Sequence, residues 1–506
     1  MKLRSSAHLR VVPRAADFAV YHRIYGGLFL VDRPGLDLLG YFETPRTEED
    51  ACRDHPELEA ATLARFLDFC TQRRVLVQPE ADEEAIVADR ARARERDLVV
   101  GRQIRIVQLV LANRCNFKCT YCFEGLGATP LSETIYAHST PERLEAQASR
   151  ENSIMRPEQA EAYLESAIRL AKRAGNEALA VQFFGGEPLV NWRTIQRVLD
   201  RFGHEHDGVS LGYSIITNGS LISDEVAQAF HEFDVPVVVS YDSPKSDARP
   251  LRGGQNSHDV IRRGLERLRR HDNRVVLNSV LGESTFEIFG HDLVDFAFDN
   301  GIWEIGVVLD LDPVFYERRS ANEIVDRLWE VCAYGRSKGV IVTGYWHQIF
   351  QGIATHDRYD QIGFSTCSAM GAQLSIEPTG DVFSCKASGG YFGTILAPEE
   401  LLASETYRTY AMRAVTSPEP CTRCPLEHFC AGMCLGPVEN RNDHDISQVE
   451  EAACDVYRAI TRRFVETATA ADVPVFFLDA GDVSVSEDEP DVSWSLRLAS
   501  LTGVGV

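Results

Sequence analysis

The segment Asn113-Arg114-Cys115-Asn116-Phe117-Lys118-Cys119-Thr120-Tyr121-Cys122 carries three cysteines in the spacing C-x3-C-x2-C. It follows a strand-like run at 104–111. Thiolates bind zinc and iron–sulfur clusters, and a structural zinc site needs a fourth ligand that this segment does not supply. A four-iron cluster held by three cysteines instead keeps one iron open to a small ligand. The spacing therefore favours an iron–sulfur site at the end of this strand.

From residue 104 to 310, strand-like runs alternate with amphipathic helical stretches. This alternation predicts an α/β fold with parallel strands joined by right-handed crossovers. Six such units are too few for a closed eight-stranded barrel, so we expect an open partial barrel or a doubly wound sheet. A long loop over 125–156 interrupts the first crossover, as functional loops often do. The expected strands are 104–111, 179–184, 212–216, 235–241, 274–280 and 302–309, and the expected helices are 157–174, 191–203, 222–233, 257–271 and 287–300.

Polar and glycine-rich residues follow the later strands of this pattern. Phe184-Gly185-Gly186-Glu187-Pro188 follows the second strand, and Thr217-Asn218-Gly219 follows the third. Ser240-Tyr241-Asp242 ends the fourth strand, Asn278 ends the fifth and Asp310 ends the sixth. Taken singly, each of these is also compatible with a simple turn. Because the carboxyl ends of parallel strands meet at one edge of the sheet, we expect these residues to lie together with the three cysteines.

Together these motifs, with Tyr121 before the last cysteine, resemble those of the radical S-adenosylmethionine (SAM) enzymes over about residues 100–310. The resemblance implies a partial (β/α)6 TIM-like barrel over 100–340, with a four-iron, four-sulfur (4Fe-4S) cluster on Cys115, Cys119 and Cys122 that binds SAM at its open iron. It implies reductive cleavage of SAM to a 5′-deoxyadenosyl radical, fed by a low-potential donor such as flavodoxin or ferredoxin. It also implies that rim residues contact the cofactor: Gly185, Gly186 and Glu187 near the methionine amino group, Thr217, Asn218 and Ser240 near the ribose and carboxylate, and Asp242 beside them.

A second group of seven cysteines lies between 367 and 454, in the order Cys367-x12-Gly380-x4-Cys385, Cys421-x2-Cys424-x5-Cys430-x3-Cys434, Cys454. This order resembles the SPASM extension of peptide-modifying radical enzymes, which we expect over 341–470. A zinc ribbon is the alternative, although seven thiolates exceed what one tetrahedral zinc can use. The resemblance implies two auxiliary 4Fe-4S clusters, hence three clusters in all, one on Cys421, Cys424, Cys430 and Cys454 and the other on Cys367, Cys385 and Cys434.

The chain departs from the fully ligated members of that group at Gln373, where they carry a further cysteine. The auxiliary cluster nearer the barrel then has two alternatives. A substrate thiolate binds its open iron, or another side chain or water fills that position and the cluster only relays electrons. The relay is slightly favoured, because an open position alone does not specify a thiol.

Residues 1–90 form a candidate separate module. Runs at 18–22 and 27–31 around Tyr25-Gly26-Gly27 predict a β-hairpin, and helical patterns follow. This order resembles the winged-helix-like domains that recognise precursors of ribosomally synthesised, modified peptides (RiPPs). An exposed edge strand of such a module would capture an extended leader peptide by strand addition, whereas a plain packing domain is the alternative. Residues 79–98 predict a linker or surface helix, and residues 471–506 predict an acidic C-terminal tail.

Composition limits the partners. The chain has 506 residues, 13 cysteines and a net charge of −23, which disfavours nucleic acid. No run reaches the length of about 18 apolar residues that spans a bilayer, and the first residues lack the pattern of a secretion signal, so we expect a cytoplasmic protein with no membrane partner. In a reducing compartment, clustered cysteines more often bind metal than form disulfides.

The resemblance leads to one favoured function. We expect a radical SAM/SPASM peptide maturase that installs an intramolecular crosslink in a ribosomal precursor peptide, a carbon–carbon cyclophane or a thioether, with carbon–carbon slightly favoured. Asp310 is the candidate catalytic residue. One alternative is a dehydrogenase of protein side chains like the anaerobic sulfatase maturases. The other is a zinc-binding peptide scaffold without catalysis. The sequence leaves the substrate peptide, the catalytic base and the oligomeric state open.

Overall fold

The computed structural model describes residues 1–123, 153–355, 367–430, 432, 434–441 and 445–478. The expected loop over 125–156 lies almost entirely outside the described residues. All six strands expected between 104 and 310 are present, and all are parallel. They are β7 (Ile106–Val110), β8 (Ala178–Phe184), β10 (Val209–Thr217), β11 (Val237–Ser240), β12 (Val275–Leu281) and β13 (Glu304–Leu309).

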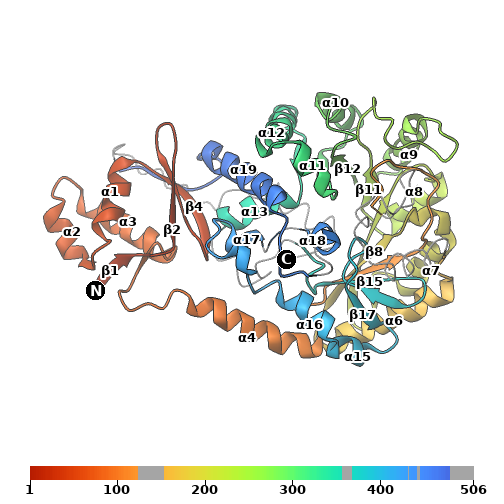
Figure 1. The fold of residues 1–506 in the computed structure, drawn as a ribbon, viewed down its shortest axis with the longest axis horizontal. Helices are drawn as coiled ribbons and strands as arrows, with labels where there is room; N and C mark the ends of the chain where they lie inside the picture. Colours follow the sequence, from red (N-terminus) through yellow and green to blue (C-terminus); the bar gives the residue numbers. More distant parts are fainter. Residues whose placement is uncertain (124–152, 356–366, 431, 433, 442–444, 479–506) are drawn as a thin grey trace.

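The five helices expected between these strands also form, each within a few residues of its expected bounds. They connect successive strands and cover the outer face of the sheet (Figure 1). Strands buried on both faces carry little polar sequence, and β7 is buried at every position. The helices are α6 (Pro157–Arg173), α7 (Trp192–Phe202), α8 (Asp224–Glu232), α9 (His258–Arg270) and α10 (His291–Asp299).

The sheet is larger than the sequence predicts. The short strand β14 (Ile341–Thr343) pairs in parallel with β13, and β15 (Gln373–Ile376) pairs in parallel with β7 at the opposite edge. From β15, the sheet continues through the antiparallel strands β16 (Asp381–Phe383) and β17 (Tyr391–Thr394). Residues 341–470, where the SPASM extension was expected, are called the Cys-rich segment below. This segment thus contributes a strand to each side of the six-stranded core.

The N-terminal module contains the expected hairpin, β3 (Phe18–His22) and β4 (Gly26–Val31), with β2 (Leu9–Pro13) paired to β3. Three helices follow. Asp32 caps the first by accepting a hydrogen bond from Gly35 N at 3.0 Å, and Thr47 and Asp50 form a capping box on the second. The helices are α1 (Arg33–Tyr41), α2 (Glu48–Asp54) and α3 (Ala60–Gln72), and the small strands β1 (Lys2–Ser5), β5 (Arg46–Thr47) and β6 (Leu76–Val77) form a second sheet beside them.

The C-terminal segment returns to this module. Strand β18 (Val475–Phe476) pairs in parallel with β4, so the N-terminal sheet has the order β18-β4-β3-β2. The segment expected to be a tail from 471 therefore begins with a strand of the N-terminal sheet. The acidic stretch near 484–491 lies outside the described residues.

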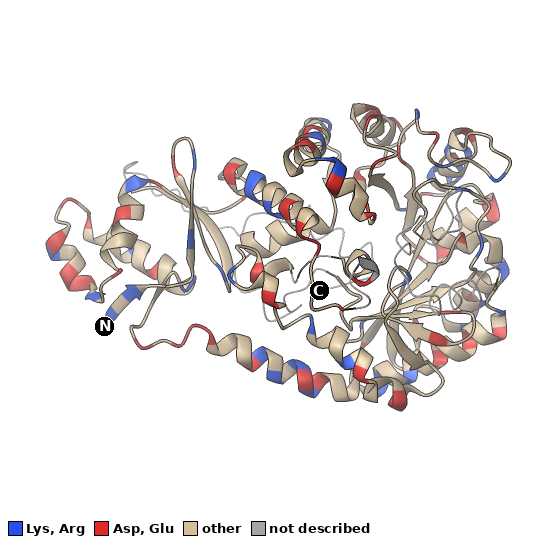
Figure 2. Ribbon diagram, viewed as in Figure 1, with Lys and Arg blue, Asp and Glu red and all other residues tan. Residues whose placement is uncertain are grey.

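Residues 79–98, expected as a linker or surface helix, contribute most of α4 (Ala85–Val100). This helix runs from the module to the sheet and packs on α15 (Pro398–Ala403) and α16 (Glu405–Met412) (Figure 1). Charged residues of both signs mark α4 and the outer helices, whereas the strands carry few (Figure 2). In the part of the chain that the structure describes, no helix has the length and apolarity to cross a membrane.

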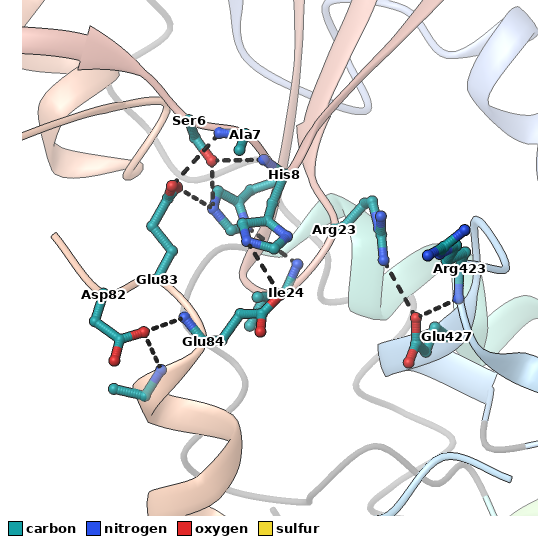
Figure 3. A network of polar contacts seen from close by, with 12 residues as sticks. Ser6, Ala7, His8, Arg23, Ile24, Asp82, Glu83, Glu84, Arg423 and Glu427 are labelled. Atoms are coloured by element: carbon teal, nitrogen blue, oxygen red, sulfur yellow. Dashed lines mark hydrogen bonds and ion pairs between the residues drawn. The ribbon is translucent and has the colours of Figure 1, made fainter. Parts of the chain in front are cut away.

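A polar network fixes the hairpin turn of the module (Figure 3). His22 Nδ1 accepts hydrogen bonds from Ile24 N and Tyr25 N at 3.0 and 3.3 Å, while His22 Nε2 lies 3.0 Å from Ser6 Oγ. Burial lowers the pKa of His22, which favours the neutral ring that can accept these bonds. Beside the turn, Arg23 pairs at 3.2 Å with Glu427 of α17 (Glu427–Cys430), so the hairpin is anchored on the Cys-rich segment.

Candidate functional site

The three cysteines of the C-x3-C-x2-C motif follow the carboxyl end of β7, where the sequence placed them. Their loop is held by a segment that the sequence did not single out, 248–252, between β11 and α9. Lys118 N donates to Pro250 O at 2.8 Å, and Thr120 N donates to Ala248 O at 2.9 Å. An isolated bridge joins Phe117 to Leu251. This antiparallel brace gives an otherwise irregular loop main-chain partners.

The thiol groups of this loop lie near one another. Burial raises the pKa of Cys115 to about 12, and Glu187, Cys119 and Cys122 add to the rise. Two N–H groups point at the Cys115 sulfur, Phe117 N at 3.3 Å and the Asn218 side-chain amide at 3.7 Å. Such donors stabilise a thiolate once a metal replaces its proton.

The donor set fits a four-iron cluster. Three thiols from one loop are the ligands that such a cluster takes when one iron stays open. Within the described ranges, no three His, Cys, Asp or Glu side chains form a group that could hold a single metal ion.

The turn after β8 is pressed against the end of β7. Gly185 has φ +143°, and a Cβ placed there would lie 2.5 Å from Ala112 O. Gly186 N donates to the same carbonyl at 2.8 Å, and Glu187 N donates to Arg114 O at 3.0 Å. Only glycine fits the first position, since both its backbone conformation and its space exclude a side chain. The turn thus fixes the backbone directly before Cys115.

Glu187 ties the ends of two neighbouring strands together. Its carboxylate accepts hydrogen bonds from Thr217 Oγ1 at 2.7 Å, Asn218 N at 2.7 Å and Leu189 N at 3.0 Å. The side chain is fully buried, and burial raises its pKa while these bonds oppose the rise. In this arrangement Glu187, Thr217 and Asn218 satisfy one another, and they shape the rim from behind the cysteine loop.

Asp242 connects the next part of the rim to the cysteine loop. Its carboxylate accepts hydrogen bonds from Tyr121 OH at 2.5 Å and from Val280 N at 3.1 Å. Arg249, from the bracing segment, donates to Tyr121 OH at 2.6 Å. Ser240 lies two residues before Asp242, at the end of β11. The structure therefore brings the rim residues expected from the sequence to the edge that carries the cysteines.

Asp310 lies at the carboxyl end of β13. Its carboxylate accepts hydrogen bonds from Asp312 N at 3.1 Å and Glu283 N at 3.3 Å. Burial raises the pKa of Asp310 to about 6, although these bonds act in the opposite direction. A carboxyl group with a pKa near neutrality at the rim of a parallel sheet is suited to exchange a proton with a substrate.

The seven later cysteines fall into two spatial groups. Cys421, Cys430 and Cys424 each raise the pKa of Cys454, beside the larger effect of burial. Cys454 lies in α19 (Glu451–Thr467). This is the set of four that the sequence assigned to one auxiliary cluster.

The other group is formed by Cys367, Cys385 and Cys434. Burial raises the pKa of Cys434 well above its ordinary value, and Cys367 and Cys385 add to the rise. Gln373, at the position of the absent cysteine, lies within reach of this group, since its side chain hydrogen-bonds Cys385 and lowers the pKa of that thiol against the larger effect of burial. Gln373 also accepts a hydrogen bond from Ser368 Oγ at 3.0 Å.

A buried ion pair that the sequence did not predict links the two parts of the site. Lys386 donates to Glu377 Oε1 at 3.0 Å and to Asn113 Oδ1 at 2.5 Å, and Asn113 donates in turn to Glu377 Oε2 at 2.8 Å. Lys386 is 5% exposed and follows Cys385, while Asn113 precedes Cys115 by two residues. The two cysteine loops are therefore joined by a short polar chain.

Comparison with known proteins agrees with this geometry. The sequence profile of the Radical SAM superfamily matches residues 109–289. The radical SAM cyclopropyl synthase TigE of Paramaledivibacter caminithermalis is 37% identical over 449 residues, which cover 89% of this chain and 92% of that protein. The chain belongs to the radical SAM superfamily. It is thus a radical SAM enzyme, and SAM and a 4Fe-4S cluster are its cofactors.

More distant similarity covers part of this radical SAM enzyme. The GTP 3′,8-cyclase of Ectopseudomonas mendocina is 26% identical over 274 residues, 52% of this chain and 72% of that protein. The solved structure of native anSMEcpe with bound AdoMet shares the fold, with a TM-score of 0.55 and 18% identity, covering 71% of this chain and 96% of that chain. The open parallel sheet is therefore the radical SAM α/β fold, as expected, and is consistent with a partial TIM barrel.

Proposed function

We propose that this enzyme forms a carbon–carbon bond within a ribosomally made precursor peptide, closing a cyclopropyl ring in an aliphatic side chain. The observation that carries the proposal is the 37% identity to a cyclopropyl synthase along 92% of that protein's length. A three-membered ring differs from the cyclophane and thioether crosslinks expected from the sequence, because the new carbon–carbon bond joins carbons of one residue.

The proposed reaction removes two hydrogens from the side chain. The cluster and SAM, when bound, supply a 5′-deoxyadenosyl radical that takes one hydrogen atom. The second hydrogen leaves as a proton, and we assign its acceptance to Asp310, whose pKa of about 6 leaves it ionised at neutral pH. Ring closure also releases one electron, for which auxiliary 4Fe-4S clusters on the two later cysteine groups would supply the acceptor.

The position of Tyr345 supports a substrate site beside the cysteine group 367, 385 and 434. Tyr345, directly after β14 and its following glycine, keeps 51% of its surface exposed. Burial nevertheless raises its pKa, and Cys367, Cys385 and Cys434 add to the rise. Tyr345 is thus an exposed side chain close to this cysteine group, and it would face a bound peptide there.

We assign the cofactors as three 4Fe-4S clusters: one on Cys115, Cys119 and Cys122 with SAM, and two on the auxiliary groups. Anaerobic iron and sulfide analysis tests this assignment. The full protein is expected to hold about 12 irons, and the triple variant Cys115→Ala/Cys119→Ala/Cys122→Ala about 8, because the auxiliary cysteines are untouched. Zinc in place of iron would contradict the assignment and would favour a scaffold without catalysis.

Product analysis tests the reaction. The enzyme is incubated without oxygen with SAM, dithionite and each candidate precursor peptide found among the neighbouring reading frames, and the peptide is examined by mass spectrometry and NMR. We expect loss of two hydrogens, one 5′-deoxyadenosine per ring and cyclopropyl proton signals at high field. The triple cysteine variant is the control and should form none of these. A thioether, an oxidised Cys or Ser side chain or an unchanged peptide would each overturn the proposal.

We also propose that the N-terminal module binds the leader of this precursor, and that a small low-potential protein such as flavodoxin or ferredoxin reduces the cluster. The order β18-β4-β3-β2 supports the first proposal, because only the two-residue strand β18 lies between β4 and an open edge where an extended peptide can pair. A labelled leader peptide should bind the enzyme without SAM. Equal binding of a scrambled peptide would contradict a role in recognition.

A further inference from the structure

Without β18, strand β4 would be the edge of the N-terminal sheet. The enzyme's own segment around β18 already pairs with it as an extended strand. Leu30 N donates to Pro474 O at 2.9 Å, and the parallel register pairs Val475 with Leu30 and Phe476 with Val31. This is the geometry of strand addition, in which main-chain bonds give affinity and side-chain pockets give specificity.

An aromatic pocket receives the side chain of this segment. Phe476 is completely buried, with its ring centroid 5.0 Å from that of Phe66 and 5.5 Å from that of Phe69. Both partners belong to α3, so the pocket lies between this helix and β4. Leu478 packs against the same cluster. The neighbouring Phe477 packs instead against the main core.

The opposite edge of the sheet is less suited to an added strand. There β2 ends at Pro13, which has no N–H group to donate. The β4 edge with its aromatic pocket is therefore the better seat for a peptide.

We infer that the β4 edge and the Phe66–Phe69 pocket form an exchangeable peptide seat, and that residues 473–478 occupy it until the leader of the precursor peptide replaces them. The identity of the incoming peptide rests on the proposed function. The seat fits an extended apolar segment with an aromatic side chain at the position of Phe476. Exchange is feasible because only two residues of β18 pair with β4.

The attachment of the occupant to the chain sets the strength of this competition. A tethered segment competes at an effective concentration on the order of millimolar. The apparent affinity of a free peptide is then the affinity of an open seat multiplied by the fraction of enzyme molecules whose seat is open. Weakening the resident strand should therefore tighten binding of a peptide in solution, even though nothing in the seat itself has changed.

Hydrogen exchange of the unaltered enzyme tests the exchange directly. The probe is an acetylated synthetic peptide with the sequence of residues 472–480, whose mass separates it from the enzyme's own fragments. Excess probe should speed amide exchange in residues 473–478 of the enzyme, while the amides of β4 stay protected because a strand still covers them. Unchanged exchange of 473–478 at saturating probe would overturn the inference.

Variants of the full chain give a second test by fluorescence anisotropy with a labelled form of the same probe. Phe476→Ala empties the pocket and should bind the probe at least tenfold more tightly than the unaltered enzyme. Phe477→Ala is the matched control and should bind like the unaltered enzyme, because its side chain lies outside the pocket. Equal affinities of all three proteins, or equal gains in both variants, would contradict the inference.

Both measurements need neither SAM nor turnover, so they separate the two proposals. If the enzyme exchanges its C-terminal strand but forms no ring, the exchangeable seat stands and the proposed reaction is wrong. If the enzyme forms the ring while residues 473–478 never leave β4, the proposed reaction stands and the exchangeable seat is wrong.

Discussion

The sequence predicted the positions of several side chains at the rim, but it did not predict which residues they contact. The cysteine loop at 115–122 follows from its spacing, whereas the division of the seven later cysteines into two groups followed from the resemblance to the SPASM extension. Glu187 was expected at the methionine amino group, yet its carboxylate accepts hydrogen bonds from Thr217, Asn218 and Leu189. The sequence did not single out Lys386 and Glu377, since a buried ion pair is recognisable only once the two segments that carry it are placed.

The hydrogen bonds of Glu187 can be tested with Glu187→Gln. The amide retains one acceptor but turns an N–H2 group toward one of the donors, which leaves buried groups unpaired at a cost of about 1–3 kcal/mol. We expect a lower Tm by calorimetry and weaker SAM binding by titration calorimetry. Glu165→Gln on α6 is the control, because its pair with Arg201 is exposed. Equal effects of the two substitutions would refute the role of Glu187.

The raised pKa of Asp310 predicts a dependence on pH. Its folded-state pKa of about 6 exceeds the ordinary value, so the folded protein binds the extra proton and stability falls as pH rises toward 6. Asp310→Asn removes the charge, and its stability relative to the unaltered enzyme should grow by about 1–3 kcal/mol between pH 4 and 6.

Turnover should show the opposite trend, because only the ionised carboxylate accepts a proton. Product formed per 5′-deoxyadenosine should rise with pH through about 6 in the unaltered enzyme and stay low at every pH in Asp310→Asn. A variant with an unchanged pH profile would remove Asp310 from the reaction.

At the scale of helices and strands, hydrophobic periodicity was sufficient for the core and failed for short elements. Every strand and helix expected between 157 and 309 is present near its expected place. The elements that were missed include three short strands, β14, β15 as a member of the core sheet and β18, which have two to four residues. Periodicity needs longer windows, and their partners lie far away in sequence, so only tertiary pairing defines them.

The turn between β8 and the following 3-10 helix gives a prediction at this scale. Gly185→Ala would place a Cβ 2.5 Å from Ala112 O at φ +143°. The backbone before Cys115 must then move, so we expect loss of at least about 2 kcal/mol of stability and a lower iron content on reconstitution. Gly212→Ala in β10 is the control, because its new methyl group meets nothing within 4 Å. Full iron loading of Gly185→Ala would show that the turn tolerates the change.

Across the whole molecule, the module, the sheet and the Cys-rich segment are interlocked. Strands from 341–376 extend the core sheet at both edges, and Arg23 joins the module to the segment that carries Cys424 and Cys430. The sequence predicted three consecutive units, because composition changes along the chain. It could not predict that strands of the later units pair with the sheets of the earlier units.

The link between the two cysteine loops gives a prediction for the whole site. Lys386→Met leaves the buried Glu377 carboxylate without its cation, a change that costs about 3–5 kcal/mol in such pairs. Besides lower stability, we expect more 5′-deoxyadenosine for each cyclopropyl ring formed, because the spacing of the two cysteine loops is less well fixed. Lys172→Met breaks the exposed pair with Asp207 and is the control. An unchanged ratio would limit Lys386 to a structural role.

The pairing of β18 with β4 also constrains how the protein is made. Leu30 leaves the ribosome on the order of tens of seconds before Val475 at ordinary rates of translation. During that interval the first module lacks Phe476, and the pocket between α3 and β4 stays open to water or to chaperones. A premature stop codon near the end of the gene would therefore damage the oldest part of the nascent chain, and the module that is synthesised first is the last to be finished.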